Sequence, residues 1–95
     1  MGKLTPSQKK AITAMESALK GLKQNKIKIH LMDSALMYAT ESAIEDYSEH
    51  LTQNYPDVAE LGQLKSSGEI EDITIDDRIG DFRMPSGFQM DGGAW

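Results

Sequence analysis

The apolar positions near the start of the chain recur at the spacing of an α-helix. Ile12, Met15, Leu19 and Leu22 are separated by three, four and three residues, which places them on one stripe. The preceding Thr5-Pro6-Ser7-Gln8 fits a capping box with proline at the first helical position. The pattern predicts a helix from about Pro6 to Lys23, with Asn25 as a left-handed stop.

A second apolar pattern follows after a short connection. Lys26 to His30 alternates between polar and apolar residues, and we interpret it as a connector, with a short strand as the alternative. Met32, Leu36, Ala39, Ala43, Tyr47 and Leu51 then recur at helical spacing. This predicts a long second helix over about Ile29–Gln53, packed antiparallel against the first.

The pattern breaks at Asn54-Tyr55-Pro56-Asp57, because a residue before proline disfavours helical conformation. Pro56 can open a short third helix carrying Val58, Leu61 and Leu64, and Ser66-Ser67-Gly68 ends it. The predicted fold class is therefore mainly α. Residues 1–67 form a two-helix hairpin body with a short third helix, and 68–95 form an extended, acidic, partner-binding tail.

The charge is distributed unevenly along the chain, whose formal net charge is −5. Residues 1–28 carry seven lysines and one glutamate, whereas residues 29–95 carry three basic residues and fourteen acids. Such asymmetry is typical of a basic arm and an acidic face or tail. Because the whole is acidic and no aromatic side chains interleave with the lysines, nucleic acid is not the expected main partner.

Candidate chemistry is sparse in this sequence. The absence of cysteine excludes a disulfide scaffold and a thiol nucleophile. The two histidines, His30 and His50, lie roughly 30 Å apart on the predicted second helix, too far to share a metal ion. The acid-rich run from Asp72 to Asp81 lacks the spacing of a calcium loop. We expect no enzymatic activity, no cofactor and no metal.

The predicted tail offers the clearest candidates for partner contacts. Large apolar side chains stand among acids and glycines in a segment too polar to fold alone. They are Ile73, Ile75, Phe82, Met84, Phe88, Met90 and Trp95. The leading hypothesis is a non-enzymatic structural or accessory subunit of a larger assembly, with a virus-particle component as the first guess.

A second hypothesis uses the acidic side of the predicted second helix. Glu41, Glu45, Asp46 and Glu49 could imitate a row of phosphates and block a nucleic-acid-binding protein. The expected partners are thus protein subunits, with self-association of the hairpin as an option. No stretch is apolar enough to span a membrane and the N-terminus lacks a signal-peptide pattern, so we expect a cytoplasmic protein without membrane contact.

Overall fold

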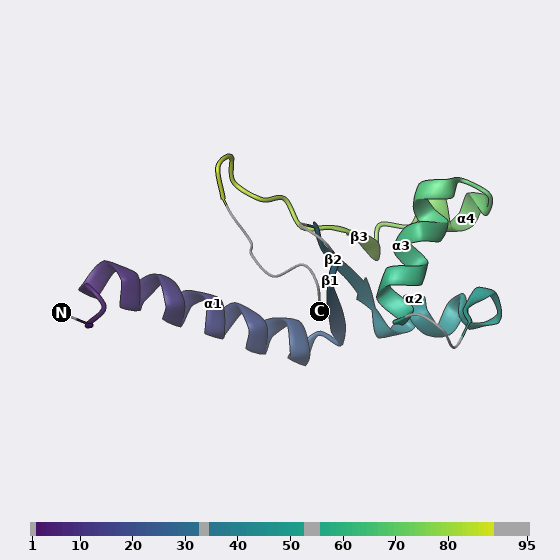
Figure 1. The fold of residues 1–95 in the computed structure, drawn as a ribbon. Helices are drawn as coiled ribbons and strands as arrows, with labels where there is room; N and C mark the ends of the chain where they lie inside the picture. The colour runs from purple at the N-terminus through teal and green to yellow at the C-terminus, as the bar shows by residue number, and fades with distance from the viewer. Residues whose placement is uncertain (1, 33–34, 53–55, 89–95) are drawn as a thin grey trace.

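The computed structural model describes residues 2–32, 35–52 and 56–88. Along these residues the chain forms α1, two paired strands, four short or medium helical segments and a third strand (Figure 1). The strands form one antiparallel sheet in the order β1-β2-β3. The fold is therefore a mixture of helices and sheet, and the prediction of a mainly α hairpin is wrong.

The first helix, α1, spans Pro6–Gln24 and confirms the predicted capping box. The Gln8 N–H donates to the Thr5 hydroxyl oxygen over 3.1 Å, and the Thr5 N–H donates to the Gln8 side chain over 2.9 Å. At the other end Asn25 is the C-cap, but Lys26 is the residue with a left-handed φ of 56°. The reversal of direction therefore occurs one residue later than predicted.

The predicted second helix over Ile29–Gln53 is wrong, because its first half is a β-hairpin. The strand β1 (Ile27–Met32) pairs antiparallel with β2 (Ala35–Thr40), from Ile27 opposite Thr40 to Met32 opposite Ala35. The alternation in Lys26–His30 was the correct signal, and the strand alternative was the right one. The apolar residues of β2 fit both the helical and the strand spacing, so the cross-strand pairing determined their conformation.

Only the later part of that predicted helix is helical. The short helix α2 (Glu41–Asp46) begins at the N-cap Thr40, whose hydroxyl oxygen accepts from the Ala43 N–H over 3.1 Å. A 3₁₀ turn, η1 (Ser48–His50), follows it. The third predicted helix is confirmed as α3 (Asp57–Ser67), with Pro56 as N-cap and the left-handed Gly68 as C-cap.

Residues after Gly68 were predicted to form an extended tail, and this too is wrong for the first part. A helical turn, α4 (Glu71–Thr74), precedes the strand β3 (Ile79–Asp81), which pairs antiparallel with β2. Ordering this acidic segment costs conformational entropy, and the prediction took that cost to keep the segment extended. Burial of Ile73 and Ile79 in the core offsets the cost.

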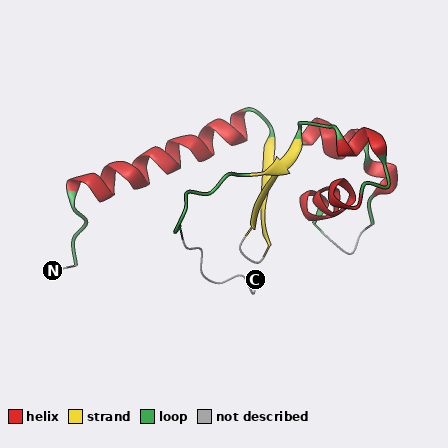
Figure 2. Cartoon of the chain, turned by 90° about the horizontal axis from the view of Figure 1, so that it is seen from above, coloured by secondary structure: helices red, strands yellow, loops and turns green. Residues whose placement is uncertain are grey.

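The core lies on one face of the sheet. The buried side chains of Met37 and Ala39 face α3, and Leu61, Ile73 and Ile79 are almost completely buried with them. Figures 1 and 2 show α2, α3 and α4 together on this side of the strands, whereas α1 and the segment after β3 leave on the other side. We call that second side the open side.

Candidate interaction surface

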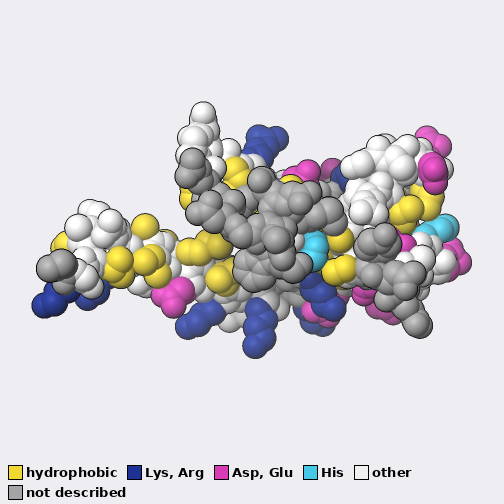
Figure 3. Space-filling model, in the orientation of Figure 1, with side chains coloured by type: hydrophobic (Ala, Val, Ile, Leu, Met, Phe, Trp, Pro, Cys, Tyr) yellow, Lys and Arg dark blue, Asp and Glu magenta, His cyan; other side chains and the backbone are white. Residues whose placement is uncertain are grey.

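Most of the apolar stripe of α1 lies on the open side and stays exposed among the described residues, although Leu22 at its end is partly buried. None of the residues of α1 is buried. Ile12, Met15 and Leu19 remain 48%, 52% and 40% exposed. Figure 3 shows hydrophobic side chains in a row along this helix, with lysines gathered along its lower edge. A helix with a clean apolar face and no core of its own is typical of an interface element.

The outer face of the sheet continues this apolar surface. Met37 and Ala39 point into the core, so Leu36 and Tyr38, which alternate with them along β2, point outward. Cross-strand pairing places Ile29 opposite Tyr38, and Leu31 opposite Leu36, on the same outer face. Ile29 is 39% exposed, and the other three are partly buried.

A shallow groove joins the helix to the sheet. It has a volume of about 230 Å³ and lies where the last turns of α1 meet the start of β1. Leu19 and Leu22 line it from the helix, Ile27 and Ile29 from the strand, and Glu41 from the start of α2. We call Ile12, Met15, Leu19 and Leu22, together with this groove, the α1–β1 strip.

The segment after β3 adds aromatic side chains to the open side. The Phe82 N–H donates to the Leu36 carbonyl over 2.8 Å, and the Phe82 ring meets the Tyr38 ring edge-on with centroids 5.1 Å apart. The Tyr38 hydroxyl reaches across Gly80, where a Cβ would lie only 2.8 Å from it. Gly80 thus leaves room for the tyrosine that Phe82 contacts.

The predicted partner-binding residues are divided between the core and the surface. Ile73 is completely buried in the chain's own core, so its side chain faces no partner. Ile75 is 73% exposed, Phe88 is 59% exposed, and Met84 is also exposed. Phe82 is partly buried against Tyr38. Met90 and Trp95 lie outside the described residues. The sequence prediction assigned the stripe of α1 to a hairpin core, with self-association of the hairpin as an option for its uncovered part, and did not identify the stripe itself as an exposed surface.

The residues of the predicted acidic face are exposed, but they lie on two elements. Glu41, Glu45 and Asp46 belong to α2, and Glu49 belongs to η1. The guanidinium of Arg78 neutralises Asp46, with Nη1 2.8 Å from Oδ2. The row of four charges on one long helix that the sequence predicted is therefore not formed.

Arg78 also holds the most strongly perturbed carboxylate of the described residues. Its Nη2 and Nε donate to the two oxygens of Asp76 over 2.7 Å and 3.0 Å, and the Tyr47 hydroxyl donates to Asp76 over 2.8 Å. The hydrogen bonds from Arg78 hold the pKa of Asp76 well below its usual range. The same carboxylate raises the pKa of the Tyr47 hydroxyl, mainly by accepting its hydrogen bond.

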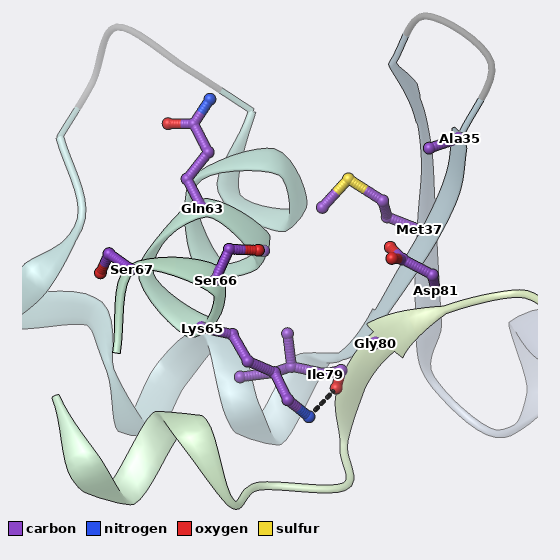
Figure 4. Close-up of a pocket in the computed structure, with 10 residues that line it drawn as sticks. Ala35, Met37, Gln63, Lys65, Ser66, Ser67, Ile79, Gly80 and Asp81 are labelled. Atoms are coloured by element: carbon purple, nitrogen blue, oxygen red, sulfur yellow. Dashed lines mark hydrogen bonds between the residues drawn. The ribbon is translucent and has the colours of Figure 1, made fainter. Parts of the chain in front are cut away.

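These contacts hold the loop before β3 in place, so the network has a structural role. The Lys65 ammonium donates to the carbonyls of Asp76 and Ile79, which fixes the same loop to α3. Figure 4 shows the hydrogen bond to Ile79. The neighbouring groove of about 700 Å³ lies between α3 and the strands β2 and β3, with Met37 and Ile79 at its floor. Its charged groups, Lys65 and Asp81, come from different elements and are not paired with each other in the described structure.

No metal site emerges among the residues that the structure describes. His30 lies in β1 and His50 in η1, and no three histidine, aspartate or glutamate side chains of the described ranges are grouped to hold an ion. Over the same ranges, no helix combines the length and apolar character needed to cross a bilayer. The chain matches no protein-family model, and comparison with curated proteins and with solved structures finds no match.

Proposed function

We propose that this protein is a non-enzymatic interaction protein, a small accessory or structural subunit that docks onto other protein subunits through its open side. The observation that carries the proposal is the exposed apolar stripe of α1, which continues into the outer face of the sheet. Soluble proteins rarely leave a contiguous apolar surface of this extent uncovered unless it binds something.

The segment after β3 supplies the anchors for a protein partner. Met84 and Phe88 project from the open side on a short turn, in which the Phe88 N–H donates to the Pro85 carbonyl over 3.1 Å. Gly87 has a φ of 79°, the left-handed conformation that the third position of a type II turn requires. Aromatic and methionine side chains held in this way are common interface anchors. A virus-particle subunit is the narrower form of this proposal.

Site-specific photocrosslinking in the native cells tests the proposal. A photoreactive phenylalanine analogue replaces Phe88 or Met84 in two separate variants, and a third variant carries it at Glu71, which is exposed on α4 away from the open side. We expect Phe88 and Met84 to yield the same crosslinked protein subunit and Glu71 to yield none of it. Identical adduct patterns at all three positions would contradict docking through the open side.

The acidic-inhibitor alternative has weaker support from the geometry. Glu41 and Glu45 lie four residues apart on α2, so they share a face, but Asp46 is paired with Arg78 and Glu49 is on a separate turn. The photoreactive analogue at Glu45 tests this alternative in the same cells. Capture of a nucleic-acid-binding protein there, and not at Phe88, would favour it over docking through the open side.

A further inference from the structure

We propose that two copies of this chain pair through the α1–β1 strip. The two α1 helices run antiparallel, and the N-terminal turns of each lie toward the groove between α1 and β1 of the other copy. The proposal rests on the proposed function, because it takes the open side to be an interface. It adds a named partner for the α1 part of that interface, a second copy of the chain.

The spacing of the stripe suits an antiparallel copy. The intervals of three, four and three residues between Ile12, Met15, Leu19 and Leu22 read the same in both directions. A reversed copy therefore presents the same apolar pattern, with Ile12 beside the partner subunit's Leu22 and Met15 beside the partner's Leu19. Intervals alternating between three and four residues are those of paired helices. Ala11 and Ala18 flank the stripe and allow the helices to approach closely.

The exposed area is more than large enough for a stable dimer. The chain exposes 7510 Å² to solvent, whereas a compact folded chain of its 10.5 kDa mass exposes about 5,400 Å². The difference is roughly 2,000 Å² per chain, and a standard interface takes only about 800 Å² from each partner. A contact of standard size along α1 would therefore take up less than half of this excess and would require no change in the core.

The charges beside the strip are of both signs. Lys23 and Lys28 line the groove together with Glu41, so the N-terminal turns of the other copy meet no purely acidic surface there. Lys10 and Lys20 lie off the apolar stripe by helical position, so they do not have to enter the contact. The apolar stripe, and not charge pairing, therefore carries the contact.

Two other occupants fit the structure less well. The described elements after α1 leave Ile12 and Met15 48% and 52% exposed, so they do not cover the stripe. An anionic membrane surface would attract the lysines of α1, but the acidic remainder of the molecule would be repelled from it. A second copy covers the apolar face without that repulsion.

Sedimentation of the purified full-length protein over a concentration series tests the pairing. We expect a mass twice the 10.5 kDa of one chain at micromolar concentration. Met15→Glu should weaken the dimer at least tenfold, because it places a charge in the stripe. Ser17→Glu adds the same charge on the opposite side of α1 and should leave the dimer intact.

Loss of the dimer in Met15→Glu cannot be attributed to unfolding, because Met15 is exposed and belongs to no core cluster. A wild-type chain that stays monomeric throughout the series overturns the proposal. So does a monomer that binds vesicles of phosphatidylcholine and phosphatidylglycerol in a manner abolished by Met15→Glu. Equal weakening by Met15→Glu and Ser17→Glu would likewise count against the stripe as the contact.

Engineered cysteines test the orientation in a chain that has none of its own. A mixture of Ile12→Cys and Leu22→Cys chains should form a mixed disulfide rapidly, and either chain alone should form little. A disulfide between two Ile12→Cys chains would show parallel helices and overturn the antiparallel arrangement. Failure of the dimer leaves the photocrosslinks at Phe88 and Met84 unaffected, so the two proposals can fail separately.

Discussion

At the scale of single residues, Asp76 is the point at which the loop before β3 is fixed to the body of the fold, by which we mean the elements from β1 to β3. It accepts from Arg78 and Tyr47, and only 11% of its side chain is exposed. Asp76→Asn keeps the shape and removes the charge. We expect it to lower the free energy of unfolding by about 1–3 kcal/mol at neutral pH, because charge-assisted hydrogen bonds are lost in a largely buried site.

The same residue should make stability depend on pH in the acid range. The pKa of Asp76 is ordinary in the unfolded chain, at 3.8, and lies well below that value in the folded protein. Its stabilisation is therefore complete above pH 3.8 and is lost as the pH falls from there toward the folded-state pKa. Urea unfolding at a series of pH values should show a shallower acid decline in Asp76→Asn. Asp77→Asn, at an exposed neighbour, should reproduce the wild-type curve.

At the scale of elements, the two threonine-capped helices differ in what they are attached to. Thr5 caps α1, which buries none of its residues, and Thr40 caps α2, which carries the fully buried Ala43. Each alanine substitution removes about 1 kcal/mol of helix capping. Thr40→Ala should therefore lower the stability of the whole body, whereas Thr5→Ala should lower only the helicity of α1.

Hydrogen exchange measured at dilute concentration separates these effects. We expect faster exchange of the first α1 amides in Thr5→Ala, with unchanged protection of the amide of Leu61 in the core. Thr40→Ala should reduce protection at both α2 and Leu61. If Thr5→Ala destabilised Leu61 as much as Thr40→Ala does, α1 would have to be part of the cooperative core.

The elements that were predicted correctly are those with local signals. Thr5 and Gln8 form the capping box of α1, and α3 lies between its caps Pro56 and Gly68. Each of these signals depends on neighbouring residues alone, so the sequence shows it directly. Ala35–Thr40 became a strand because it pairs with β1 on one side and β3 on the other. That information is non-local, and a helical stripe through Leu36 and Ala39 imitates it.

The candidate site followed the same rule. Residues 68–95 were predicted to be too polar to fold alone; Met84 and Phe88 in this segment are exposed, whereas Ile73 and Ile79 are buried in the core. Ile73 was assigned to the partner surface because it is a large apolar residue among acids, but a turn of helix carries it into the core instead. The sequence shows that the stripe of α1 is apolar. Whether the stripe is covered depended on the predicted second helix, and the structure has two strands in place of the first half of that helix.

At the scale of the whole molecule, α1 and the body are separable by their contacts. Every core residue lies between Met37 and Ile79, and α1 touches the body mainly through β1. A chain of residues 26–95 should therefore fold, with a urea midpoint close to that of the full-length monomer. Its denaturant m-value should fall only slightly, because α1 exposes little additional surface on unfolding.

The same 26–95 chain also tests whether α1 and the rest of the molecule stabilise each other. If the body keeps its core without α1, the helix is free to serve as an arm, and its helicity should depend on protein concentration in the full-length chain. Marginal helices of about this length gain most of their stability from packing rather than propensity. Circular dichroism should then show α1 losing helix on dilution while the signal from the body stays constant. An unfolded 26–95 chain would instead show that the lysine-rich helix stabilises the acidic body within one molecule.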